Sequence, residues 1–131
     1  MTEQPADLSD PLSPEDAKLV TLARATRART RAAEGAAVRD LDGRTYAAAS
    51  VRLAHLELSA LEVCVAMAIS SASTGLEAAV VLGDVDVVDV AAASDFAGAG
   101  VPVLVGDATG RIHTRESTHT PHPSRLAPGT R

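Results

Sequence analysis

The chain has 131 residues, of which 46% are apolar, and a formal net charge of −5 from 12 basic and 17 acidic side chains. This length suits one domain that buries a core without help from a metal or a disulfide. The acidic balance argues against a protein that coats nucleic acid. A single cysteine, Cys64, excludes an internal disulfide and a cysteine-rich metal site. No apolar run has the length of a membrane span and no charged leader with an apolar segment precedes Ser13, so we expect a cytoplasmic protein that does not bind membranes.

The first helix is expected to begin directly after Ser13. Residues 1–12 are polar, acidic and interrupted by two prolines, which is typical of a disordered arm. Ser13 has the character of an N-cap, and Pro14 suits the first helical position because its missing N–H has no partner there anyway. Acidic side chains follow at Glu15 and Asp16, where they meet the positive end of the helix dipole.

A β-hairpin and a buried helix come next. Residues 36–40 and 44–50 are expected to form two strands joined through a turn that contains Gly43. Residues 52–57 are expected to be a simple connection. Residues 58–70 then form the longest apolar stretch without Pro or Gly, and Ser59 with Glu62 has the spacing of a capping box. Because this helix is apolar on nearly every side, we expect it to be central and buried on nearly every side.

The second half of the chain predicts a parallel pair of strands. Residues 76–82 and 101–105 are continuous apolar runs, typical of strands covered on both faces. A short helix within 91–99 would make the crossover between them, so the sheet is expected to be mixed, with about five strands in an α/β fold. A last, weak strand is expected near 111–114. We therefore expect one folded domain over residues 13–114 and a disordered tail over residues 115–131, which has almost nothing to bury.

The segment from Glu34 to Tyr46, EGAAVRDLDGRTY, together with the helix that begins after Ser59, resembles the zinc-dependent cytidine deaminase family. The resemblance implies a three-layer cytidine deaminase-like fold with a central helix. In the family that helix opens with T-x-C-A-E, in which the Cys binds zinc and the Glu is the general acid/base. The same frame here begins at Ser59 and places Leu61 at the metal-ligand position and Val63 at the acid/base position. Neither side chain can perform that chemistry.

The other family motifs are changed as well. The P-C-x-x-C motif, which supplies the remaining zinc ligands, falls on residues 85–89 and replaces both cysteines by Asp86 and Asp89. If Leu61 faced the site, the neighbouring Glu62 would point elsewhere. We therefore expect no catalytic residues, no zinc and no other cofactor. Three further family features also differ. Where the family has the N-x-E that binds the ribose hydroxyl, this chain has Ser50-Val51-Arg52. Glu34 stands at the position of an apolar family Val, and Ala32 stands at the position of a family Phe.

The leading interpretation is a cytidine deaminase-like protein without deaminase activity, a pseudoenzyme that acts as a binding or assembly module. The resemblance implies a homo-oligomer and a nucleoside-like ligand. One alternative is an active cytidine or deoxycytidine deaminase, a hydrolase, with a rebuilt metal site. Another is a carboxylate metal-binding protein that uses Asp86 and Asp89, since two carboxylates at i and i+3 can share a hard cation. Cys64 is expected to be an inert core thiol and His55 a loop histidine.

Overall fold

The first helix begins where the sequence predicts. The computed structural model describes residues 12–121. Helix α1 (Pro14–Thr30) has Ser13 as its N-cap, and the Ser13 hydroxyl accepts a hydrogen bond from the Asp16 amide over 3.1 Å. The guanidinium of Arg39, on the first strand of the sheet, pairs with Asp16 and with Glu77, so the start of α1 is tied to the sheet.

The sheet has five strands and is mixed, as expected from the sequence. Its order is β2-β1-β5-β6-β7. Strand β5 pairs with β6 in parallel and every other neighbouring pair is antiparallel, which confirms the predicted crossover. The bounds are β1 (Glu34–Asp40), β2 (Thr45–Ala49), β5 (Leu76–Gly83), β6 (Pro102–Gly106) and β7 (Ile112–Ser117).

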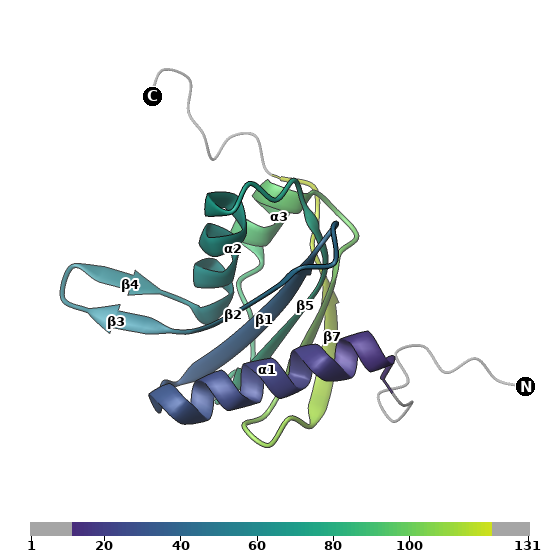
Figure 1. The fold of residues 1–131 in the computed structure, drawn as a ribbon. Coiled ribbons are helices and arrows are strands. Elements are labelled where there is room, and N and C mark those ends of the chain that lie inside the picture. The colour runs from purple at the N-terminus through teal and green to yellow at the C-terminus, as the bar shows by residue number, and fades with distance from the viewer. Residues whose placement is uncertain (1–11, 122–131) are drawn as a thin grey trace, which may run out of the picture.

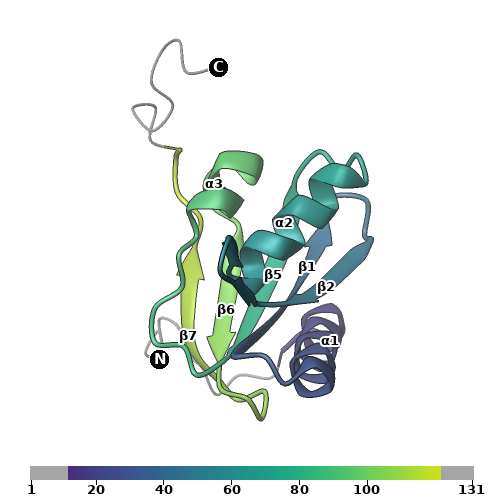
Figure 2. The same ribbon diagram turned by 90° about the vertical axis from the view of Figure 1, so that its left-hand side faces the viewer.

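Helices cover both faces of this sheet and make three layers (Figures 1 and 2). Helix α1 covers one face, where Leu19 and Ala23 are fully buried against strand residues such as Val80. Helices α2 (Ala60–Ser70) and α3 (Ala91–Ala97) cover the opposite face and form the second buried cluster. The α/β class and the position of the apolar helix across the sheet are confirmed.

Helix α2 is less enclosed than the sequence suggests. Its capping box is present, and Leu61, Cys64 and Ala68 lie in the core. Its outer side is open, however, because Met67 is 36% exposed and Ile69 is 54% exposed. The expectation of burial on nearly every side was wrong. Helix α2 packs on one sheet face only, and the described chain supplies no layer outside it.

The connection expected at residues 52–57 is in fact a two-stranded hairpin. Strands β3 (Val51–Leu53) and β4 (Leu56–Leu58) pair antiparallel and project away from the body of the domain (Figure 1). Leu53 is 65% exposed and Leu56 is 48% exposed on this hairpin. An isolated two-stranded ribbon is only marginally stable in water, and within the described chain these two leucines add little burial to it.

The folded part continues past the expected boundary at residue 114. Strand β7 reaches Ser117, and Thr118 is 4% exposed. The Thr118 hydroxyl accepts a hydrogen bond from the Val101 amide and donates one to the Gly98 carbonyl. At the other end, Leu12 packs against the α1-side cluster. The rest of the arm and tail expected at the two ends, residues 1–11 and 122–131, lies outside the described residues. Within residues 12–121, no helix combines the length and the apolarity that crossing a membrane would require.

Candidate ligand pocket at the start of α2

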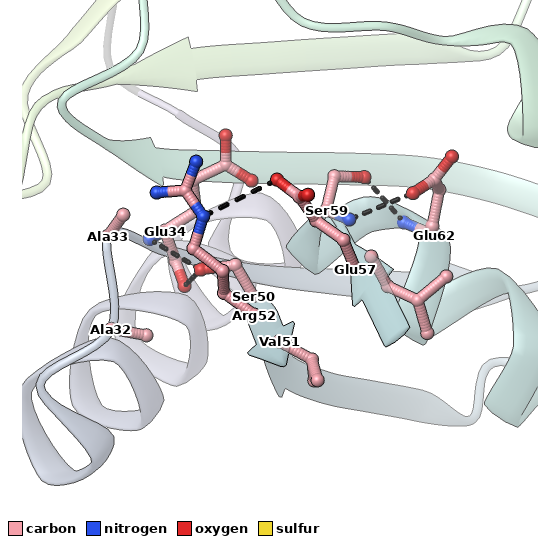
Figure 3. A pocket seen from close by; sticks show the side chains of 10 residues that line it. Ala32, Ala33, Glu34, Ser50, Val51, Arg52, Glu57, Ser59 and Glu62 are labelled. Carbon is pink, nitrogen blue, oxygen red and sulfur yellow. Dashed lines mark hydrogen bonds and ion pairs between the residues drawn. The ribbon is translucent and has the colours of Figure 1, made fainter. Parts of the chain in front are cut away.

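A pocket of about 470 Å³ opens at the N-terminus of α2 (Figure 3). It lies where the end of β2, the hairpin β3–β4, the start of β1 and the first turn of α2 meet. Residues 50–62 supply the residue after β2, the hairpin and the helix start in one stretch, and the pairing of β1 with β2 brings residues 32–34 beside them. The lining residues are Ala32, Ala33, Glu34, Ser50, Val51, Arg52, Glu57, Leu58, Ser59 and Glu62.

Glu34 connects three elements at this pocket. The Glu34 amide donates to the Ser50 hydroxyl over 3.1 Å, and its carbonyl accepts from the Ser50 amide over 3.0 Å, so β1 and β2 are joined here. The Glu34 carboxylate then accepts a hydrogen bond from the Ala60 amide, the first residue of α2, over 3.1 Å. Glu34 therefore fixes the start of α2 relative to the sheet.

The first amides of α2 are occupied by protein acceptors. The Ser59 amide donates to the Glu62 carboxylate over 2.8 Å, and the Glu62 amide donates to the Ser59 hydroxyl over 3.1 Å. With the bond from Ala60 to Glu34, the amides of Ser59, Ala60 and Glu62 at this helix start are satisfied. Both carboxylates are half-buried in the pocket wall.

Among the residues that the structure describes, Arg52 is the cation that lines the pocket, and it lies at the rim. The Arg52 side chain is 84% exposed and its Nε is 3.5 Å from a carboxylate oxygen of Glu57, which is 67% exposed. The wall near α2 thus carries carboxylates, whereas the positive charge is in solvent and paired.

The structure does not bring Leu61 and Val63, which stand at the family's ligand and acid/base positions, into this pocket. Leu61 is 1% exposed and belongs to the core cluster beneath α2. Val63 is half-buried in a separate shallow groove on the helix, with Tyr46 and Met67. Glu62, between them, is the α2 side chain that lines the pocket together with the N-cap Ser59.

Asp86 and Asp89 lie in the link between β5 and α3, and both are exposed. A carboxylate oxygen of Asp89 accepts from the Ala91 amide over 2.9 Å at the start of α3. The link meets α2 through apolar side chains instead, because Val85, Val88 and Leu61 share one buried cluster.

The residues at these positions do not fit a zinc ion. Tetrahedral zinc needs three or four nitrogen, sulfur or carboxylate ligands around one point. The α2 position carries leucine, and the two aspartates point to solvent. No three His, Cys, Asp or Glu side chains within residues 12–121 are grouped so that they could hold a metal ion.

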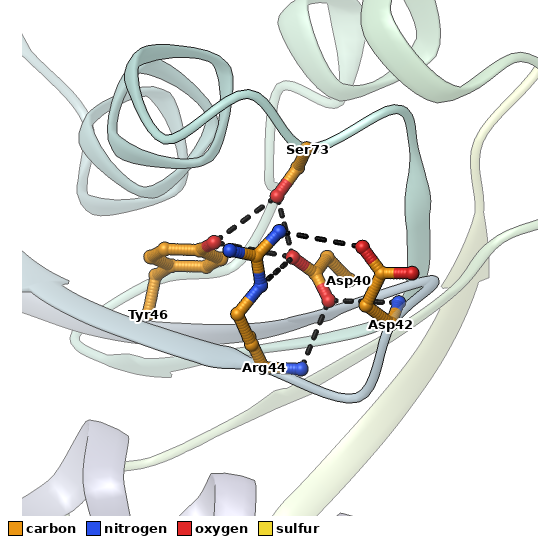
Figure 4. A network of polar contacts seen from close by, with 5 residues as sticks. All are labelled: Asp40, Asp42, Arg44, Tyr46 and Ser73. Carbon is orange, nitrogen blue, oxygen red and sulfur yellow. Dashed lines mark hydrogen bonds and ion pairs between the residues drawn. The ribbon is translucent and has the colours of Figure 1, made fainter.

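A buried polar network supports the α2 side of the sheet from the end opposite the pocket (Figure 4). Asp40, 1% exposed, accepts hydrogen bonds from the hydroxyls of Ser73 and Tyr46 and from the amides of Asp42 and Arg44. Burial by itself raises the pKa of Asp40, but the bonds from Ser73, the Arg44 and Asp42 amides and Tyr46 outweigh it and lower the pKa to about 2. The network joins the β1–β2 turn to the link that precedes β5.

The structure agrees with the expectations that Cys64 is an inert core thiol and that His55 is a loop histidine. Cys64 is fully buried, and burial raises the pKa of its thiol to about 12, so it is not a nucleophile at neutral pH. His55 is exposed in the turn of the β3–β4 hairpin and does not line the pocket.

Sequence reasoning found some of the pocket residues but not the pocket. The S-x-x-E spacing identified Ser59 and Glu62 as a cap, and Ser50 and Arg52 were noted only as changed family positions. Glu34 was missed as a cap for α2, since no local pattern marks a contact between residues 26 positions apart.

Comparison with known proteins identifies the family and agrees with the fold. The family model described as cytidine deaminase-like matches residues 12–110. The chain therefore belongs to the cytidine deaminase-like family. It is similar in fold to cytidine deaminase from Burkholderia pseudomallei, with a TM-score of 0.67 at 17% identity over 82% of this chain and 94% of that one. It is also similar to cytidine deaminase from Mycobacterium leprae, with a TM-score of 0.62 at 18% identity over 88% of this chain and 99% of that one. No curated protein sequence matches the chain.

Proposed function

We propose that this protein is a cytidine deaminase-like binding module that holds a nucleoside-like small molecule and does not deaminate it. The observation that carries the proposal is the pocket at the start of α2. Its volume of about 470 Å³ suits a small molecule, and polar groups of Glu34, Ser50 and Glu62 surround it. The structurally similar proteins are cytidine deaminases, which suggests the class of ligand.

The side chains at the family's zinc-ligand and acid/base positions cannot support deamination. Hydrolytic deamination of a cytosine ring uses a zinc-activated water and a nearby carboxyl group that moves protons. Leu61 and Val63 offer neither, and both are directed away from the pocket. An active deaminase with a rebuilt centre would need a new ligand set, and the only thiol, Cys64, is buried in the core. A carboxylate metal site at Asp86 and Asp89 is not favoured, because both face solvent.

We also propose that the protein is a cytoplasmic homo-oligomer. The cytoplasmic location rests on the expectation from the sequence. The assembly is supported by the projecting hairpin, whose Leu53 and Leu56 are exposed, and by the open side of α2 at Met67 and Ile69. Exposed apolar groups of this kind are typical of surfaces that contact another protein.

Calorimetric titration with cytidine tests the binding role. Ala33 is an exposed pocket residue, so Ala33→Trp should fill part of the pocket and abolish binding without disturbing the core. Ala25→Trp, at an exposed position on α1 outside the pocket, is the matched control and should bind like the wild type. Saturable binding that only Ala33→Trp removes supports the proposal. Release of uridine and ammonia during the titration would contradict it.

A further inference from the structure

We propose that Glu34 is a specificity-determining residue that keeps anionic ligands out of the pocket at the start of α2. The pocket then accepts uncharged or cationic molecules rich in N–H and O–H donors, and it rejects their phosphorylated forms. This inference rests on the proposed binding function of the same pocket and names the chemistry of its ligand.

Glu34 contacts the start of α2 and occupies one of its amides. The N-terminus of a helix ordinarily favours anions, because its free amides and its dipole attract negative charge. Here the amide of Ala60 already donates to the Glu34 carboxylate over 3.1 Å. The preceding amide, that of Ser59, donates to Glu62 over 2.8 Å. A phosphate that approached these amides would have to displace carboxylates that belong to the protein.

The side chains that line the pocket carry more negative than positive charge. Three carboxylates, those of Glu34, Glu57 and Glu62, line it against one guanidinium. That guanidinium, on Arg52, is 84% exposed and paired with Glu57 at the rim. A phosphate in the pocket would therefore face the half-buried carboxylates of Glu34 and Glu62, and the guanidinium that lines the pocket is already paired with Glu57. Amino and hydroxyl groups would instead find acceptors there.

Hydrogen bonds and packing fix Glu34 at the pocket wall. Two hydrogen bonds join its backbone to Ser50, on the neighbouring strand end, so its Cα has a fixed place beside α2. Its side chain is half-buried between β1 and the helix start. Such a carboxylate cannot swing into solvent as freely as an exposed surface glutamate, and it keeps its charge in the pocket wall.

The experiment measures phosphate binding by ¹⁵N–¹H correlation spectra of the wild type and of Glu34→Gln and Glu34→Ala. Glu34→Gln keeps a carbonyl acceptor for Ala60 and removes only the charge, whereas Glu34→Ala also frees the amide. The amide signals of Ser59, Ala60 and Glu62 report binding at the site, and the dispersion of the whole spectrum reports folding. Glu15→Gln is the matched control, since Glu15 is exposed in the first turn of α1 and does not line the pocket.

We expect inorganic phosphate to shift these amides in both Glu34 variants with at least about tenfold higher affinity than in the wild type and in Glu15→Gln, because a unit charge at contact distance has been removed. Glu34→Gln decides the question alone if Glu34→Ala does not fold. Phosphate binding to the wild type as tight as to Glu34→Gln would overturn the inference.

A second titration separates this inference from the proposed function. The wild type should bind cytidine at least about tenfold more tightly than cytidine 5′-monophosphate, and Glu34→Gln should narrow that ratio. Equal affinity of the wild type for the two ligands would overturn the inference while leaving a binding role intact. If neither ligand binds, the proposed nucleoside role fails, and the phosphate titration still decides whether Glu34 excludes anions.

Discussion

The hydroxyl of Ser73 donates a hydrogen bond to the carboxylate of Asp40, which lies 33 positions earlier in the chain. This contact closes the buried network that also contains Tyr46, whose ring borders the groove along α2. The β1–β2 turn and the link before β5 are thereby fixed to each other on the side of the sheet that carries α2.

Replacing Asp40 should reveal how much this network stabilises the fold. The pKa of Asp40 falls from 3.8 to about 2 on folding. A lowered carboxyl pKa stabilises the folded state above the unfolded pKa, and this stabilisation is lost as the pH falls from about 5 towards 2. Asp40→Asn should lower the free energy of unfolding at pH 7 by about 2 kcal/mol and should flatten its dependence on pH in that window.

Denaturant titrations at pH 7 and pH 3 measure both effects. Asp84→Asn, at an exposed position, is the control and should keep the pH dependence of the wild type. An Asp40→Asn protein that loses stability towards acid as steeply as the wild type would show that other carboxylates dominate.

Leu61 should behave as an ordinary core residue. It is 1% exposed, so Leu61→Ala should cost about 2–5 kcal/mol through lost burial and a residual cavity. Leu41→Ala, at a residue 60% exposed, should change stability by less than about 0.5 kcal/mol. Combining Leu61→Cys with Val63→Glu should still give no deaminase activity, because the two side chains are directed to different places. A silent Leu61→Ala would mean that Leu61 lines open space.

Cys64 should be chemically inert in the folded protein. It is fully buried, and its thiol pKa of about 12 leaves almost no thiolate at pH 8. Iodoacetamide should therefore label it only after unfolding in guanidinium, as measured by intact-protein mass spectrometry. Rapid labelling of the native protein would place the thiol within reach of solvent.

The projecting hairpin should mediate assembly. Sedimentation velocity is expected to give a dimer or larger species for the wild type. The double change Leu53→Glu and Leu56→Glu should shift it to the monomer, because charges replace the exposed apolar contact. The control, Leu41→Glu at an equally exposed leucine, should leave the assembly unchanged. A wild-type monomer at all concentrations would contradict the proposed homo-oligomer.

The sequence predicted the elements better than it predicted the pocket. Local signals located the caps at Ser13 and Ser59, and continuous apolar runs located the buried strands of the parallel pair. The β3–β4 hairpin was missed, because leucines separated by a turn without Gly or Pro do not look like strands. Strand β7 extends beyond the predicted end at residue 114, because every residue after Ile112 in it is polar and its pairing with β6 gives no local sequence signal.

The candidate site depends on contacts that no short motif contains. Glu34 meets α2 only after β1 and β2 have paired and α2 has packed across the sheet. The family frame drew attention to Leu61 and Val63, whereas the side chains that line the pocket on α2 are Ser59 and Glu62. Direction of side chains around a helix start is set by packing, and spacing alone does not determine it.

The most direct test of the account follows protein and ligand in one NMR sample. Labelled protein with one equivalent of zinc is titrated with cytidine, while the ring protons of the ligand are observed for a day. We predict saturating shifts of the Ser59, Ala60 and Glu62 amides and unchanged cytidine signals. Conversion of cytidine to uridine would show that the protein is an active deaminase. A full titration without shifts at these amides would show that the pocket does not hold a nucleoside.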